Sequence, residues 1–430
     1  MMMVGINAGT MVVGRNSSVL ARMRRARTGG ARAALLTLGA AMALAGGRAA
    51  CADGAVVCWG YNAHGQCNTP AGLASVTQIA GGSDHTIALK SDGTVACWGR
   101  SSEGQCNPPA GLASVTQIAG GFGHTIALKS DGTVACWGWN YYGQCSTPAG
   151  LPSVTQIAGG YLHTIALKSD GTVACWGWNG NGQCNTPAGL ASVTQIAGGV
   201  EHTIALKSDG TVACWGSNYE GQCSTPAGLA SVTQIAGGYY HTIALKSDGR
   251  VACWGYNGYG QCNTPAGLAS VTQIAGGYYH TMALKSDGTV ACWGYNGNGQ
   301  CSTPAGLASV TQIAGGNQHT IALKSDGTVA CWGSNNDLQC NTPAGLASVT
   351  QIAGGGNHTI ALTGPSLAEQ LAAAQVANAK LTAANAQQAA EILLLNARIA
   401  ILQLGDLNED GAVDGGDLAT LLNNWGIGGK

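Results

Sequence analysis

The feature that most constrains this chain is an internal repeat of 39 residues. The pattern Cys-Trp-Gly recurs eight times at this spacing, from Cys58 to Cys331, and Gly-Gly-x-x-His-Thr recurs with the same step, from His85 to His358. A unit of this length cannot bury an apolar face alone, so neighbouring units must pack on one another. The sequence therefore predicts one repeat array instead of the roughly three domains that 430 residues would otherwise form.

The local pattern inside each unit indicates β-structure. The runs HTIALK and TVACWG have period-2 character, so that Ile126 and Leu128 share one face, and the Ser-Asp-Gly between the runs is a strong hairpin signal. SVTQIA is typical of a further strand, whereas xNxxGQC and TPAGL are typical of turns and connections. Three or four strands per unit, repeated around an axis, predict an all-β fold, namely a β-propeller over residues 53–364.

The ends of the array indicate how it closes. The array begins with the second strand of a hairpin, at residues 55–59, and ends with the first strand of another, at 358–362. Together these two half-hairpins would complete one blade and leave no exposed sheet edge. We predict eight blades closed by pairing of the first and last strands, with seven blades as the alternative.

The repeated segment GGxxHTIALKSDGTVACWGxNxxGQ resembles the repeats of the regulator of chromosome condensation family over about residues 54–363. It resembles their bacterial secreted form most, the form that includes the streptomycete β-lactamase inhibitor propellers. The resemblance implies a propeller and a protein ligand. Guanine-nucleotide exchange, which the family name implies, is a less favoured function than binding.

The N-terminus predicts export. Residues 1–32 are basic without an acid, residues 33–47 are apolar, and small residues precede Asp53. This order is typical of a secretory signal over residues 1–52. We expect a secreted, periplasmic or cell-surface protein, attached to the membrane only if the signal stays uncleaved. The rest of the chain has 12 basic and 20 acidic residues, which argues against a nucleic-acid partner.

Every unit contains two cysteines separated by eight residues. In an exported chain such regular pairs predict disulfides, either within a unit or between neighbouring units. The cysteines concerned are Cys58, Cys67, Cys97, Cys106, Cys136, Cys145, Cys175, Cys184, Cys214, Cys223, Cys253, Cys262, Cys292, Cys301, Cys331 and Cys340.

The repeated histidines and tryptophans are interpreted as structural. Each histidine begins a strand without a repeated carboxylate beside it, and we expect it to bond backbone groups of its own blade. The tryptophans are expected to pack between blades. No nucleophile, base and orienting group can be assembled that is not simply repeated eight times, so we predict no catalytic residues and no enzyme.

The positions that differ between copies are the candidate binding surface. They follow Trp-Gly or precede the histidine, and they are rich in aromatic residues and asparagine, as binding loops are. We predict that they bind a macromolecule, preferably a protein, with a lectin-like carbohydrate-binding protein as the alternative. The opposing hypothesis is neutral drift of exposed loops. The candidates are Trp139, Tyr141, Tyr142, Tyr161, Trp178, Tyr219, Tyr239, Tyr240, Tyr256, Tyr259, Tyr278, Tyr279 and Tyr295.

The composition changes after residue 364. Residues 365–404 predict a helical stalk or a coiled coil, through which the chain could form a homo-oligomer. Residues 405–430 resemble half of a dockerin, with oxygen ligands at alternating positions of one EF-hand-like loop. Calcium is the one predicted cofactor, while cohesin binding would need a second half. The predicted ligands are Asp406, Asn408, Asp410, the carbonyl of Ala412, Asp414 and Asp417.

Overall fold

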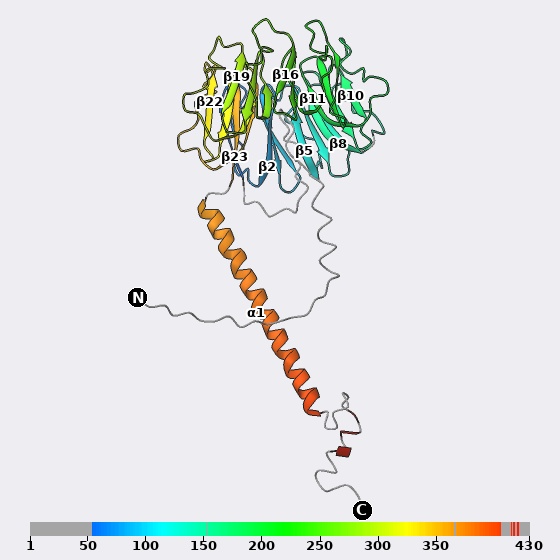
Figure 1. The fold of residues 1–430 in the computed structure, drawn as a ribbon, viewed down its shortest axis with the longest axis vertical. Helices are drawn as coiled ribbons and strands as arrows, with labels where there is room; N and C mark the ends of the chain where they lie inside the picture. Colours follow the sequence, from blue (N-terminus) through cyan, green and yellow to red (C-terminus); the bar gives the residue numbers. More distant parts are fainter. Residues whose placement is uncertain are drawn as a thin grey trace, which may run out of the picture.

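A computed structural model describes residues 54–151, 153–364, 367–405, 414, 416–417 and 419–420. The predicted secretory signal and most of the predicted calcium loop lie outside these residues. Within them, the strands form three-stranded antiparallel sheets arranged around a common axis (Figure 1). The prediction of an all-β propeller followed by a helix is therefore confirmed.

Each of seven sheets consists of three strands that follow one another in sequence, and we call these the contiguous sheets. In each, the strand that begins with histidine lies in the middle. Their strands are β2 (Val76–Gly81), β3 (His85–Lys90), β4 (Val95–Gly99); β5 (Val115–Gly120), β6 (His124–Lys129), β7 (Val134–Gly138); β8 (Val154–Gly159), β9 (His163–Lys168), β10 (Val173–Gly177); β11 (Val193–Gly198), β12 (His202–Lys207), β13 (Val212–Gly216); β14 (Val232–Gly237), β15 (His241–Lys246), β16 (Val251–Gly255); β17 (Val271–Gly276), β18 (His280–Lys285), β19 (Val290–Gly294); β20 (Val310–Gly315), β21 (His319–Lys324), β22 (Val329–Gly333).

A further three-stranded sheet combines the two ends of the array. It consists of β23 (Val349–Gly354), β24 (His358–Thr363) and β1 (Ala55–Gly60), with β24 in the middle. The pairing of β1 with β24 is antiparallel and runs from Ala55 opposite Thr363 to Gly60 opposite His358. The first and last strands of the array thus have the same register as the second hairpin of every other sheet.

The predicted Asp-Gly hairpins join the second and third strands of the seven contiguous sheets. In the first, Gly93 has a φ of 79°, which favours glycine, and the Asp92 carboxylate accepts hydrogen bonds from the backbone N–H and hydroxyl of Thr94. These bonds lower the pKa of Asp92 to about 2. Lys90 forms an ion pair with the same carboxylate at 3.2 Å.

Apolar packing occurs between neighbouring sheets. Trp98 of the first contiguous sheet packs in one cluster with Ile79 of its own sheet and with Ile360 and Leu362 of β24. Equivalent clusters join each of the other neighbouring pairs. The predicted packing role of the tryptophans is confirmed, and the core consists of layers between blades.

Two sets of polar contacts also join neighbouring sheets. The buried His85 Nε2 lies 3.1 Å from Thr125 Oγ1 of the next sheet, and this hydroxyl donates to the backbone carbonyl of Gln105. The histidines are structural, but their partner is the neighbouring threonine and not backbone of the same blade, contrary to our expectation. In the second set, Gln78 Oε1 accepts the Ile118 N–H of the next sheet.

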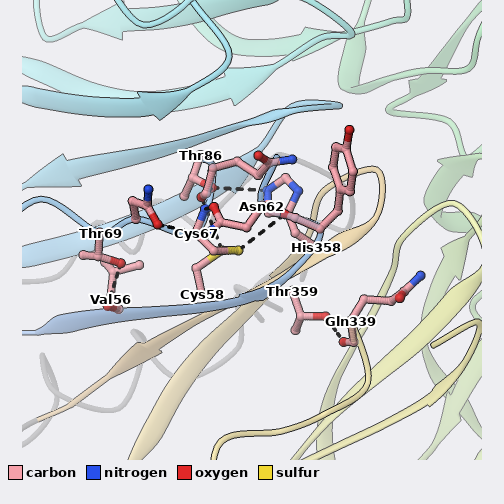
Figure 2. The surroundings of a disulfide bond; sticks show 12 residues. Val56, Cys58, Asn62, Cys67, Thr69, Thr86, Gln339, His358 and Thr359 are labelled. Atoms are coloured by element: carbon pink, nitrogen blue, oxygen red, sulfur yellow. Dashed lines mark hydrogen bonds between the residues drawn. A yellow bond between two sulfur atoms is a disulfide. The ribbon is translucent and has the colours of Figure 1, made fainter. Parts of the chain in front are cut away.

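Both sets also join the sheet formed by the chain ends to the first contiguous sheet. His358 Nε2 lies 3.2 Å from Thr86 Oγ1, and the Ile79 N–H donates to Gln351 Oε1 at 3.1 Å. Figure 2 shows the first of these contacts beside the Cys58–Cys67 disulfide. Every interface between neighbouring sheets therefore has the same kinds of contact.

The propeller has two chemically different faces. We call the face at the histidine end of the middle strands the loop face, and the opposite one, which carries the Ser-Asp-Gly turns, the hairpin face. The chain leaves β24 at Gly364, on the hairpin face, and continues into α1 (Leu367–Gly405), which lies outside the propeller in Figure 1. No helix among the described residues has the length and apolar character needed to span a membrane.

Candidate functional site

Two kinds of loop form the loop face, and the sequence varies in both. The first kind joins the first and second strands of a sheet and contains Gly-Gly-x-x. The second kind follows Trp-Gly and crosses to the next sheet. Backbone bonds fix them together: the Arg100 N–H donates to the Asp84 carbonyl at 2.8 Å, and Trp139 and Tyr256 make the equivalent bond in their sheets.

The first variable residue of each Gly-Gly-x-x loop lies at the axis. These residues and the adjacent glycines line a cavity of about 350 Å³ at the centre of the loop face. Glycine is needed here because a Cβ on Gly120 would lie 2.5 Å from the Gly81 carbonyl oxygen. The axial residues are Ser83, Phe122, Tyr161, Val200, Tyr239, Tyr278, Asn317 and Gly356.

Six aromatic side chains form one connected group, which we call the tryptophan group. Phe122 and Tyr161 have ring centroids 4.2 Å apart at the axis, and Phe122 also contacts Trp139 at 6.0 Å. Contacts then continue outward through the second kind of loop. The group consists of Phe122, Trp139, Tyr141, Tyr142, Tyr161 and Trp178.

A second group contains tyrosines alone, and we call it the tyrosine group. Tyr239 stacks on Tyr278 with ring centroids 3.7 Å apart, and Tyr240 contacts Tyr239 at 4.4 Å. Tyr279 connects this inner part to the outer loops. The group consists of Tyr239, Tyr240, Tyr256, Tyr259, Tyr278, Tyr279 and Tyr295.

The packing of the tyrosine group changes the acidity of its hydroxyls. Partial burial, together with the neighbouring Tyr278 hydroxyl, raises the pKa of Tyr239 to about 12. Burial, Tyr239 and the negative charges of Glu201 and Glu220 raise the pKa of Tyr240 to about 12. These phenols stay neutral at physiological pH and can donate hydrogen bonds to a ligand.

Twelve of the thirteen predicted binding residues therefore belong to two aromatic groups on one face. Tyr219 is the exception, because it is 85% exposed and has no ring contact within the described residues. Phe122 is not among the predicted residues, although it occupies the same variable position as Tyr161. The acidic residues of this face are not among them either, because they are spread over distant repeats.

A second pocket lies between the first two contiguous sheets, with a volume of about 150 Å³. Phe122 and Trp139 form its apolar wall, while Asp84, Arg100 and Glu103 form its polar wall. The Arg100 guanidinium lies 3.6 Å from the Asp84 carboxylate, so this pair is largely neutralised. The pocket is the place where charged side chains and the tryptophan group meet.

The cysteine pairs lie within the repeat units. Cys58–Cys67 and Cys292–Cys301 are disulfides. Four further pairs have sulfur atoms 2.7 to 3.2 Å apart, as in Cys97 and Cys106. The last two pairs, which begin at Cys136 and Cys214, also interact through their side chains. Each pair links the end of a third strand to the loop that follows it.

Of the predicted calcium ligands, only Asp414 and Asp417 are described. The Asp417 carboxylate is buried and accepts the backbone N–H of Asp414 at 2.7 Å. Asp406, Asn408, Asp410 and Ala412 lie outside the described residues. Among the residues that are described, no three His, Cys, Asp or Glu side chains are close enough together to hold a metal ion.

The fold and its repeated loops define a β-propeller of tandem three-stranded sheets. The regulator of chromosome condensation (RCC1) repeat matches the chain at residues 76–105, 115–144, 154–183, 193–222, 232–261, 271–300 and 310–339, and the chain belongs to this family. Each match covers one contiguous sheet and the start of the following loop. The sheet that combines the chain ends is split in sequence, so it lies outside these matches.

Two solved structures share this fold. Prp20p from Saccharomyces cerevisiae matches with a TM-score of 0.52 and 19% identity, over 77% of this chain and 96% of Prp20p. Yeast RCC1 (Prp20) bound to Kap60 matches with a TM-score of 0.52 and 16% identity, over 87% and 99%. The ectodomain of the Physcomitrella patens receptor kinase CR4 has 25% identity, a TM-score of 0.49, and coverages of 60% and 74%. No curated protein matches by sequence.

Proposed function

We propose that this chain is an exported protein that binds another protein through the loop face of its propeller. The observation that carries the proposal is the gathering of thirteen variable aromatic residues into two contiguous groups on one face. Partly exposed aromatic rings are the side chains that contribute most to protein interfaces. Prp20p, which shares the fold, binds Gsp1p and histones and was solved with Kap60.

The scaffold we infer is a closed ring of eight blades. The pairing of β1 with β24 and the His358–Thr86 contact support closure. Closure presents both aromatic groups on one rigid surface. We further infer that all eight cysteine pairs become disulfides, which fits export to an oxidising compartment.

The two faces have separate roles in this proposal. The loop face binds, while the hairpin face continues into α1, which holds the propeller at a distance from whatever anchors the C-terminus. Apolar side chains of the helix, including Leu381 and Ile392, are exposed and would be covered in a homo-oligomeric coiled coil. No catalytic role and no nucleotide exchange is proposed.

A carbohydrate ligand is the second candidate, because exposed aromatic rings beside asparagine side chains also fit sugars. Asn181 and Asn298 are such residues on the loop face. Free sugars at high concentration should release a glycan ligand but leave a protein complex intact.

The test is affinity capture from envelope and culture fractions with the tagged full chain. The variant Tyr239→Ala/Tyr240→Ala/Tyr278→Ala/Tyr279→Ala should lose a defined protein that the parent captures. Tyr219→Ala is the matched control, because this tyrosine is exposed outside both groups. Equal recovery by the parent and the quadruple variant would contradict the proposal, as would capture of polysaccharide alone.

A further inference from the structure

We propose that the partner presents lysine or arginine side chains to the tyrosine group, where Tyr239 and Tyr240 offer ring faces and Glu201 and Glu220 offer carboxylates. The inference rests on the proposed function, because it names the chemistry of the partner at the same surface. It depends on three observations: the distribution of charge between the faces, the position of the two glutamates, and their lack of basic partners.

Charge is distributed unequally between the two faces. The seven lysines of the propeller lie at the ends of the middle strands, on the hairpin face, where each forms an ion pair with the aspartate of its own turn. Among the residues that the structure describes, the loop face has five acidic residues and a single arginine. The five acids are Asp84, Glu103, Glu201, Glu220 and Asp337. A cationic surface is therefore attracted to the loop face, and an anionic one is repelled.

Glu201 and Glu220 lie beside the inner tyrosines. Glu201 precedes the middle strand of one sheet and is the counterpart of Tyr240 in the next sheet. Glu220 is the counterpart of Tyr259, whose ring lies 5.2 Å from that of Tyr279, one repeat after Tyr240. Both glutamates act on the Tyr240 hydroxyl, whose pKa they help to raise.

Neither of these two carboxylates forms an ion pair among the described residues. The hydrogen bond to Glu201 comes from the neutral Asn181 amide at 3.0 Å. At the tryptophan group the situation differs, since Arg100 already pairs with Asp84. An incoming cation therefore finds uncompensated negative charge at the tyrosine group.

The rings and the carboxylates favour the same kind of ligand. A guanidinium or ammonium group is attracted to the face of a tyrosine ring, and its methylene stem packs on apolar surface. A neutral apolar side chain would use the rings but not the carboxylates. A carboxylate ligand would meet repulsion from both glutamates.

The test uses four blocked tetrapeptides as probes: tetra-arginine, tetra-lysine, tetra-norleucine and tetra-glutamate, titrated into the full chain by calorimetry. We expect the two cationic peptides to bind, more weakly as salt rises, and at least tenfold more tightly than the other two. The variant Glu201→Gln/Glu220→Gln should weaken tetra-arginine binding about tenfold. The matched control Asp248→Asn/Asp287→Asn removes two carboxylates from the hairpin face and should leave tetra-arginine binding unchanged.

Two further variants separate the contribution of the Tyr240 ring from that of its hydroxyl. Tyr240→Phe should retain tetra-arginine binding, whereas Tyr240→Leu should weaken it several-fold, with circular dichroism confirming that both fold. Equal binding of norleucine and arginine peptides, no binding of cationic peptides, or equal loss in the Asp248/Asp287 control would each overturn the inference. Affinity capture would still report on the proposed function, because a partner lost with the four tyrosines can lack cationic residues.

Discussion

His358 Nε2 and Thr86 Oγ1 lie 3.2 Å apart, although 272 residues separate them in sequence. The Thr86 hydroxyl donates to the Gln66 carbonyl at 2.8 Å, so it accepts the histidine N–H. The same relay joins His163 to Thr203 in the middle of the array. The contact between the two chain ends is thus chemically the same as a contact between consecutive repeats.

This equivalence predicts the effect of Thr86→Val. The substitution leaves the buried His358 N–H without an acceptor, which should lower the free energy of unfolding by about 1–3 kcal/mol. The measurement is urea denaturation followed by tryptophan fluorescence. Thr203→Val, at an interface between consecutive repeats, should have the same effect. A neutral Thr86→Val beside a destabilising Thr203→Val would show that the ring is open in solution.

Stability should decrease in mild acid because eight histidines are buried. Burial lowers the pKa of His85 to about 4 and that of His124 to about 3, whereas an unfolded chain protonates histidine near pH 6.5. The contribution of the neutral, buried histidines to the free energy of unfolding is fully present above about pH 6.5. This contribution is lost as the pH falls toward 4, by up to about 1.4 kcal/mol per pH unit for each histidine.

The measurement is the denaturation midpoint between pH 8 and pH 4. His163→Gln should reduce the slope of stability against pH by about one eighth below pH 6.5, since one of eight equal groups is removed. Constant stability from pH 8 to pH 5 would mean that the histidines are not buried as neutral groups.

Peptide mapping with a protease that cleaves only after lysine should resolve the cysteine connectivity directly. Cleavage after Lys90 and Lys129 yields the peptide 91–129, which contains both Cys97 and Cys106. Disulfides within units leave single peptides that lack two hydrogens, whereas disulfides between units join two peptides. We expect single peptides throughout, and Cys97→Ser/Cys106→Ser should destabilise the chain by about 2.5 kcal/mol through loop-closure entropy.

Calcium binding is expected at the C-terminal acidic loop. Isothermal titration of the full chain with calcium chloride should show one site, and Asp414→Asn/Asp417→Asn should weaken it at least tenfold because a hard cation needs charged oxygen ligands. Asp337→Asn, a carboxylate of the loop face, is the control. An unchanged isotherm in the double variant would exclude this loop as the site.

The sequence predicts the hairpins because their determinants are local: Asp92 and Gly93 are sufficient for the turn. It does not distinguish Tyr239 from Tyr240, which are adjacent and equally aromatic. The structure shows that the first faces the axial cavity, while the second neighbours the outer loops. The sequence does not predict the role of Gln78, because a polar residue in a strand gives no sign that its amide oxygen accepts a hydrogen bond from the next sheet.

The acidic residues of the loop face illustrate a different limit. Glu201 and Glu220 are 19 residues apart and belong to different kinds of loop, and only the ring arrangement brings them beside Tyr240. The net charge of the chain does not reveal these two glutamates either, because it also counts the aspartates and lysines that pair on the hairpin face. Composition therefore could not show that one face is acidic.

Leu338 predicts a stabilising substitution. Its φ of 63° lies in the left-handed region, and the seven equivalent positions, such as Gly299 with a φ of 80°, are glycines. A left-handed conformation costs a leucine about 1–2 kcal/mol, and this side chain is 58% exposed, so little burial compensates. After the entropy that glycine adds to the unfolded chain, Leu338→Gly should raise the free energy of unfolding by about 0.5–1 kcal/mol. Gly299→Leu should lower it by a similar amount or more, and urea denaturation of the three proteins measures both. Destabilisation by Leu338→Gly would instead show that the leucine side chain stabilises its loop by more than the backbone strain costs.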